Sequence, residues 1–164
     1  MQSMRITTKQ PVIIDMNILD VQNAIVVHQV NTLGKFGRGM AESINKRYPA
    51  VKDDYKRFVR NARHPLLGHI HSIDLDNGNT LYHLFAQASI QQRHQPKTNH
   101  TRYDALQQAF TTVARIAKTE NRVVYTPHGM GAGNAGGDWV YIEHMLQTVA
   151  DRHDIKLVFC RYTP

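Results

Sequence analysis

The chain has 164 residues, and 41% of them are hydrophobic, which suits one compact domain over residues 1–164. Its longest apolar runs are too short to cross a membrane, its N-terminus lacks the apolar core of a signal peptide, and its single cysteine excludes an internal disulfide, so we expect a cytoplasmic protein. The net charge of +7 favours anionic partners such as phosphates, nucleotides or nucleic acid, with solubility alone as the alternative.

Strands and helices alternate along the first part of the chain. Two segments rich in Val and Ile, residues 11–15 and 23–30, predict strands. Residues 37–50 predict a helix that must end before Pro49, because the residue before a proline disfavours helical backbone. Residues 51–63 predict a second helix that is mostly polar.

A β-hairpin is predicted over residues 66–87, with Asn-Gly at residues 77–78 as its turn. With a two-residue turn, His83 pairs with Ser72 and points to the opposite face from His71. That register disfavours a site in which three hairpin histidines bind one ion, and we therefore expect no metal.

The alternation of helices and strands continues to the end of the chain. It predicts a helix, a short buried strand, a second helix and a closing strand, at residues 101–120, 122–127, 139–153 and 155–162. Such alternation indicates an α/β fold, a three-layer α/β/α domain with helices on both faces of a central sheet. The hairpin and the N-terminal strand are expected to make that sheet mixed rather than purely parallel.

Glycines concentrate in two strand-to-helix loops. The segments NTLGKFGRGM, residues 31–40, and GMGAGNAGGDW, residues 129–139, hold three and five of the ten glycines. Both loops should emerge at the carboxyl edge of the sheet, where open α/β folds bind ligands and glycine lets backbone N–H groups approach an anion. Facing each other, the loops could hold a diphosphate, although two incidental glycine-rich turns are the alternative. Neither loop is a P-loop, and GAGNAG at residues 131–136 lacks the second half of a dinucleotide-binding fold.

Four segments in this order resemble macrodomains, and in particular the subclass of the terminal ADP-ribose glycohydrolase and the ADP-ribose 1''-phosphate phosphatases. They are IVVHQVNTLGKFGRGMAESINKRYP at residues 25–49, NTLYHLFAQ at 79–87, RYDALQQAF at 102–110 and PHGMGAGNAGGDW at 127–139. The resemblance covers residues 13–162. It implies a three-layer α/β/α domain that binds ADP-ribose.

The resemblance also implies how ADP-ribose would lie across the two loops. Asn17 stands where the family commonly has an aspartate that recognises the adenine amino group, and Ile18 and Tyr162 would lie on the adenine side. Because asparagine keeps an acceptor but loses a charge, we expect looser adenine recognition. The distal ribose and its phosphate would contact Asn31, Gly37, Arg38, Gly39, Met40 and Gln87. The diphosphate would be wrapped by Gly131, Ala132, Gly133, Asn134 and Ala135.

Two departures from the glycohydrolase pattern bear on the chemistry. That relative uses a lysine that attacks the distal ribose and an aspartate that assists it. In this sequence Gln87 stands at the lysine position and Ala135 at the aspartate position. Glutamine has no nucleophilic amine and alanine has no acid or base, so the sequence argues against a lysyl-adduct mechanism.

Three residues are the candidates for catalysis. Asp138 directly precedes a predicted helix, so it could serve as an acid, as the helix N-cap, or as both. His28 could act as an acid or a base, or could be a satisfied core histidine. Asn31 lies at the junction of strand and first loop, beside the expected distal ribose. His128, at the start of the second loop, is a further candidate.

The predicted function is hydrolysis of an ADP-ribose derivative by an ADP-ribose 1''-phosphate phosphatase, with backbone amides of both loops holding phosphate oxygens. The alternatives are a hydrolase that releases ADP-ribose from modified protein or nucleic acid, and a module that binds ADP-ribose without turnover. The expected partners are therefore ADP-ribose, its 1''-phosphate, or ADP-ribosylated protein or nucleic acid, with no cofactor and no membrane. The basic loop at residues 91–102 could steer such a substrate, or could simply be solvated.

Overall fold

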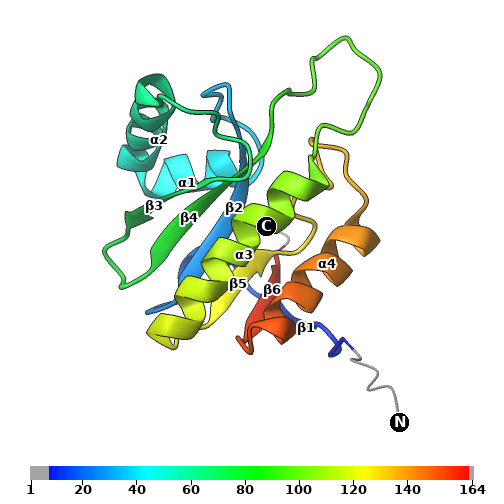
Figure 1. The fold of residues 1–164 in the computed structure, drawn as a ribbon. Coiled ribbons are helices and arrows are strands. Elements are labelled where there is room, and N and C mark those ends of the chain that lie inside the picture. The colour runs from blue at the N-terminus through cyan, green and yellow to red at the C-terminus, as the bar shows by residue number, and fades with distance from the viewer. Residues whose placement is uncertain (1–7, 163–164) are drawn as a thin grey trace.

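The computed structural model describes residues 8–162, and these residues form one sheet of six strands in the order β1-β6-β5-β2-β4-β3 (Figure 1). The strands are β1 (Val12–Asp15), β2 (Ile25–Asn31), β3 (Ile70–Asp74), β4 (Thr80–Gln87), β5 (Val124–Pro127) and β6 (Leu157–Arg161). All neighbouring strands are parallel except β3 and β4, which form the antiparallel hairpin. The sheet is therefore mixed, as the sequence predicted.

The N-terminal strand is parallel to its neighbour, so the expectation that it helps to make the sheet mixed is wrong. β1 runs parallel to β6, with Val12 opposite Val158, and the short 3-10 helix η1 (Ile18–Asp20) connects β1 to β2. Because this connection is a crossover and not a hairpin, β1 and β2 run in the same direction. Only β3 is antiparallel to its neighbour among the described strands.

Helices cover both faces of the sheet, which gives the predicted three layers (Figure 1). They are α1 (Met40–Arg47), α2 (Pro49–Asn61), α3 (Tyr103–Glu120) and α4 (Trp139–Arg152). Within β2, Ile25 and Val27 pack in the core beneath α3 and α4, whereas Val26 and Val30 pack in the core beneath α1 and α2. None of the helices in residues 8–162 combines the length and apolar character needed to cross a membrane.

Pro49 separates the two helices of one layer, as predicted. α1 ends at Arg47, Tyr48 caps both helices with non-helical backbone, and Pro49 occupies the first turn of α2. Proline is tolerated there because the first N–H groups of a helix have no partner within the helix. The chain therefore turns sharply at Tyr48, and α2 is placed against the end of β2 through Tyr55.

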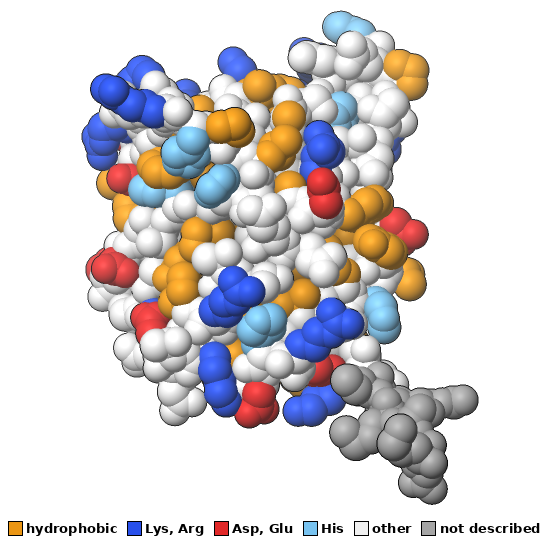
Figure 2. Space-filling model, viewed as in Figure 1, with side chains coloured by type: hydrophobic (Ala, Val, Ile, Leu, Met, Phe, Trp, Pro, Cys, Tyr) orange, Lys and Arg blue, Asp and Glu red, His pale blue; other side chains and the backbone are white. Residues whose placement is uncertain are grey.

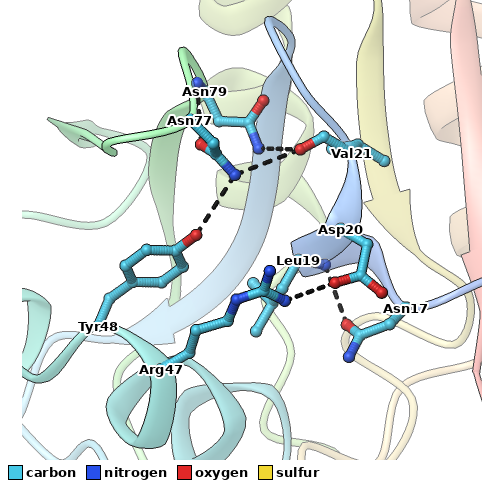
Figure 3. Close-up of polar contacts among 8 residues, drawn as sticks. All are labelled: Asn17, Leu19, Asp20, Val21, Arg47, Tyr48, Asn77 and Asn79. Carbon is cyan, nitrogen blue, oxygen red and sulfur yellow. Dashed lines mark hydrogen bonds and ion pairs between the residues drawn. The ribbon is translucent and has the colours of Figure 1, made fainter.

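The hairpin register differs from the predicted one by a single residue. Asp74 pairs with Thr80 and His71 pairs with His83, so the predicted pairing of His83 with Ser72 is wrong. The turn holds three residues, because the Leu75 N–H donates to the Asn79 carbonyl at 2.8 Å. Side chains set this turn: the Asn77 amide donates to the Val21 carbonyl and to the Tyr48 hydroxyl, both at 3.3 Å (Figure 3). As a result, His83 and His71 point to the same face of the sheet.

Candidate ligand-binding site

The two glycine-rich loops lie side by side because their strands are neighbours. β2 and β5 pair directly, with Ile25 opposite Val124, so the loops that follow them leave the same edge of the sheet. Between the loops lies a cavity of about 630 Å³. Its walls also include residues of α2 and of the segment after β4. The convergence of the two loops at the carboxyl edge, expected from the sequence, is confirmed.

Many of the predicted ligand-binding and catalytic residues line this cavity. They are His28, Asn31, Gly37, Arg38, Gly39, Met40, Gln87, Gly131, Gly133, Asn134 and Ala135. The remaining predicted residues, Asn17, Ile18, Ala132, Asp138 and Tyr162, are not part of the cavity wall. The site is thus built mainly from the first loop, the second loop and the ends of β2 and β4.

Asn31 braces the first loop with its side chain. Its Nδ2 donates to the Lys35 carbonyl at 2.8 Å, and its Oδ1 accepts from the N–H groups of Leu33 and Lys35 at 3.0 and 3.1 Å. The buried Tyr55 hydroxyl lies 2.6 Å from the Asn31 carbonyl and 3.0 Å from Oδ1. Each polar atom of this side chain therefore already has a partner, which favours a structural role over a catalytic one.

The second loop is held by close backbone contacts. The Gly137 N–H donates to the Gly131 carbonyl at 2.8 Å, and the Thr101 hydroxyl donates to the same carbonyl at 2.7 Å. The His100 N–H donates to the Ala135 carbonyl at 2.6 Å. Gly131 and Gly136 both have positive φ, so their backbone takes a conformation that other residues adopt only with strain.

Replacing Gly136 by alanine should destabilise the protein. Gly136 has φ 73°, and a Cβ there would overlap the backbone of Thr98. We expect Gly136→Ala to lower the free energy of unfolding by at least about 1 kcal/mol, measured by urea titration. At Gly133 in the same loop, no atom apart from the glycine and its two chain neighbours lies within 4 Å of the position that a Cβ would take, so Gly133→Ala is the matched control. Equal stability of the two variants would contradict this account of the loop.

Asn17 and its neighbours follow the carboxyl end of β1. The Asn17 side chain accepts from the Leu19 N–H at 3.0 Å and caps η1, and Asp20 beside it forms a 2.6 Å ion pair with Arg47 (Figure 3). Ile18 is buried, whereas Tyr162 is exposed. The adenine-side roles of these residues remain predictions.

Asp138 is the N-cap of α4, one of the two roles that its position suggested. Its carboxylate accepts from the N–H groups of Val140 and Tyr141 at 3.1 and 3.4 Å, and its own N–H donates to the Tyr103 hydroxyl at 3.0 Å. The side chain is exposed and is not part of the cavity wall. The geometry therefore favours the cap over direct chemistry.

Two substitutions of Asp138 separate these roles. Asp138→Ala should lower the free energy of unfolding by about 1 kcal/mol, whereas Asp138→Asn should change it by only a few tenths, because asparagine also caps helices. The melting temperature and the rate of hydrolysis of ADP-ribose 1''-phosphate are measured on both variants. Loss of turnover in Asp138→Asn at unchanged melting temperature would instead assign Asp138 a catalytic role.

Gln87 is tied to a residue that the sequence analysis missed. Gln29 lines the cavity, and its Nε2 donates to Gln87 Oε1 at 3.0 Å and to the Thr101 hydroxyl at 2.9 Å. The remaining Gln29 oxygen is buried without a partner among the described residues. A signal was present, because Gln29 is one of the few polar residues in the predicted strand at residues 23–30, next to His28. Gln29 therefore holds the Gln87 side chain at the cavity wall.

The charged side chains that line the cavity are cations. They are Lys35, Arg38, Lys52 and Lys56, and no carboxylate is among the described lining residues. Lys52 and Lys56, which sequence reasoning also missed, are one helical turn apart on α2. Figure 2 shows Lys and Arg side chains gathered over α2. This cationic wall suits an anionic ligand.

Two histidines line the cavity, and their surroundings differ. His28 is buried, its Nε2 lies 2.6 Å from Nδ1 of His83, and burial lowers its pKa to about 3. It is therefore neutral near pH 7 and a poor base. The His128 ring is partly exposed, and its Nε2 accepts from the Trp139 indole N–H at 3.2 Å. Within the described chain no cluster of three or more acidic, histidine or cysteine side chains is arranged to hold a metal ion.

No protein-family model matches this sequence, and no curated protein sequence matches it. Several solved structures share its fold. A protein of unknown function from Bacteroides thetaiotaomicron superposes with a TM-score of 0.83 at 19% identity, covering 94% of this chain and 99% of that one. The macrodomain of Thermus aquaticus DarG gives a TM-score of 0.72 at 19% identity, with coverage of 94% and 99%.

The third structure, Thermosipho africanus DarTG in complex with ADP-ribose, gives a TM-score of 0.76 at 12% identity. The match covers 95% of this chain and 43% of that one. At such low identity these likenesses establish the fold and not the activity. The chain therefore has the macrodomain fold, as the sequence resemblance implied.

Proposed function

We propose that the cavity binds ADP-ribose, with the diphosphate between the two glycine-rich loops. The observation that carries this proposal is one cavity walled by both loops, in which every charged side chain among the described lining residues is a cation. Its volume of about 630 Å³ falls within the range of ligand sites. Thermosipho africanus DarTG, which shares the fold, has been solved with ADP-ribose bound, and this supports the choice of ligand.

ADP-ribose 1''-phosphate is the substrate that the cations favour most. Its terminal phosphate adds negative charge beyond that of the diphosphate, and Lys35, Lys52 and Lys56 supply cations for it. None of these lysines takes part in an ion pair within the described residues. Phosphate hydrolysis needs mainly positioning and stabilisation of negative charge, which backbone amides and lysines can provide.

His128 is the residue that we assign to the attacking water. In hydrolysis, water attacks phosphorus, the bond from phosphorus to the ribose oxygen breaks, and the ribose oxygen leaves as a hydroxyl after it takes up a proton. The His128 ring lines the cavity and is partly exposed, and because its Nε2 accepts from the Trp139 indole, a neutral ring carries its proton on Nδ1. It can therefore orient the water as a hydrogen-bond donor, while the proton of the water passes through a phosphate oxygen to the leaving ribose oxygen.

Two alternatives rest on particular observations. The cavity lacks a carboxylate among its described lining residues, and Asn31 and Asp138 have structural partners, which favours a module that binds without turnover. Lys and Arg side chains gather over α2 (Figure 2), and two of the lysines there, Lys52 and Lys56, line the cavity. This favours an ADP-ribosylated nucleic acid or protein as the substrate of a hydrolase. Each alternative gives its own outcome in the experiment below.

The test is a binding and turnover panel. Calorimetry measures ADP-ribose binding, and phosphate release measures turnover of the 1''-phosphate. ADP-ribosylated protein and ADP-ribosylated DNA are assayed in parallel for released ADP-ribose. Absence of ADP-ribose binding would overturn the proposal. Binding without turnover of any substrate leaves the binding module, and turnover only of a macromolecular substrate leaves the other hydrolase.

Neutralising the lysines of α2 should weaken binding of the phosphorylated ligand. We expect the double variant Lys52→Gln and Lys56→Gln to bind ADP-ribose 1''-phosphate about tenfold less tightly or worse, since charge-assisted hydrogen bonds are lost. Arg60→Gln, on the same helix but outside the cavity wall, is the matched control. Calorimetry on the three proteins checks this, and an unchanged affinity of the double variant would exclude the lysines from the phosphate site.

A further inference from the structure

Three histidines lie in a row across neighbouring strands, on the face covered by α1 and α2. His28 of β2 pairs with His83 of β4, and His83 pairs with His71 of β3, so the three side chains share one face. The His71 ring stacks on the His83 ring with centroids 5.8 Å apart, and its Nε2 lies 2.7 Å from a carboxylate oxygen of Asp54. The row therefore runs from Asp54, near the surface of α2, to the cavity that His28 lines.

The inner pair of this row shares one proton in a hydrogen bond. His28 Nε2 and His83 Nδ1 are 2.6 Å apart, and the two side chains are 2% and 0% exposed. Burial holds the pKa of both rings below the ordinary value, so both are neutral near pH 7. A neutral imidazole carries one N–H and one acceptor nitrogen. One ring must therefore donate in this bond and the other must accept.

The surroundings of His83 decide which ring donates. His83 Nε2 is buried without a hydrogen-bond partner among the described residues. If His28 donated, His83 would have to carry its proton on this Nε2 and bury an N–H with no acceptor. If His83 donates through Nδ1, only a lone pair on Nε2 lacks a partner, and every N–H of the pair can be satisfied. Orphaned buried N–H groups are the rarer case in proteins.

We infer that His83 donates to His28 and thereby fixes His28 as the tautomer that carries its proton on Nδ1. Because Nε2 of His28 is engaged with His83, Nδ1 is the nitrogen left for the cavity. His28 then presents a neutral ring N–H donor to an oxygen of the ligand, in a wall that also holds lysines, an arginine, side-chain amides and backbone amides. His83 is a positioning residue that acts through His28. The role at the ligand rests on the proposed function, whereas the tautomer does not.

Nitrogen NMR of the ligand-free protein tests the tautomer directly. Long-range ¹⁵N–¹H correlation spectra distinguish a ring protonated on Nδ1 from one protonated on Nε2, and His28→Asn and His83→Asn spectra assign the signals. We expect both rings to be protonated on Nδ1, the form that free histidine disfavours in water. Protonation of His28 on Nε2 would overturn the inference, whether or not the protein binds ADP-ribose.

Binding by His83 variants tests the positioning role. In His83→Asn the amide nitrogen lies near the former Nδ1 and can still donate, whereas His83→Leu has a similar size and no donor. We expect the dissociation constant for ADP-ribose to rise about tenfold in His83→Leu and to stay within about threefold in His83→Asn. Urea titration shows whether each variant is folded. A loss of stability alone would weaken ADP-ribose binding in both variants, whereas the positioning role predicts that His83→Asn keeps its affinity.

The outcomes separate this inference from the proposed function. Equal binding by His83→Leu and the unmodified protein would overturn the positioning role while leaving ADP-ribose binding intact. If both variants lose binding equally, the donor on residue 83 is not what matters, and the inference also fails. If the unmodified protein does not bind ADP-ribose, the proposed function fails, and the NMR spectra still decide the tautomer of His28.

Discussion

Acidification from about pH 7 to about pH 5 is expected to destabilise the protein by about 2 kcal/mol through His28 alone. The pKa of His28 is lowered by burial from 6.5 to about 3, so between these values the unfolded chain binds a proton that the folded protein does not. The part of the free energy of unfolding that depends on the neutral His28 ring is therefore complete above pH 6.5 and is lost as the pH falls towards 3. The pKa of His83 is lowered in the same direction, first by burial and then by His28 and His71, and adds to the loss.

Urea titrations at several pH values measure this dependence. The control is His144→Gln, since His144 is an exposed residue of α4, and this variant should keep the full dependence on pH. His83→Asn, which removes one of the two buried rings, should show a shallower dependence. A free energy of unfolding that is the same at about pH 7 and about pH 5 would contradict the burial of two neutral imidazoles.

Asn31→Ala is expected to lower the free energy of unfolding by about 2–4 kcal/mol and to weaken ADP-ribose binding at least about tenfold. The substitution removes the side chain that holds the first loop at Leu33 and Lys35, and it leaves the buried Tyr55 hydroxyl with one partner fewer. A loop without this brace no longer holds its backbone N–H groups in place for a ligand.

Tyr55→Phe provides the graded comparison for Asn31→Ala. It removes the Tyr55 hydroxyl from the same cluster and leaves the Asn31 side chain in contact with the loop, so we expect a smaller loss of both stability and affinity. Urea titration and calorimetry on both variants check the order. An Asn31→Ala protein with unchanged stability and affinity but no turnover would instead show that Asn31 takes part in the chemistry.

Local residue patterns were sufficient to predict the framework of the site. Glycine clustering after two apolar strands predicted two ligand loops at one edge, and they meet because β2 and β5 are neighbours. Asp138 was correctly foreseen as a possible N-cap, because the cap depends on the residue type and the helix that directly follows. Pro49 marked a helix boundary for the same reason. The position of each loop after its strand, the cap and the helix boundary depend on neighbours in the sequence, whereas the meeting of the two loops depends on the pairing of β2 with β5.

The features that were missed depend on residues far apart in the chain. The hairpin register is set by bonds from Asn77 to Val21 and Tyr48, and no pattern within the hairpin contains them. The direction of β1 depends on its partner β6 at the other end of the chain. Lys52 and Lys56 reach the cavity because α2 packs beside the first loop, so their sequence alone suggested only a polar helix.

The adjacency of β2 and β5 also determines when, during synthesis, the site can exist. β2 and its loop leave the ribosome early, and β4 can pair with one edge of β2 soon afterwards. The other edge of β2 has no partner until β5 has been made, at residues 124–127, and only then does the second loop follow. A nascent chain that ends before this point has only the first loop of the cavity, so bound ligand cannot stabilise it. It also exposes one unpaired edge of β2, which can pair wrongly with strands of other chains.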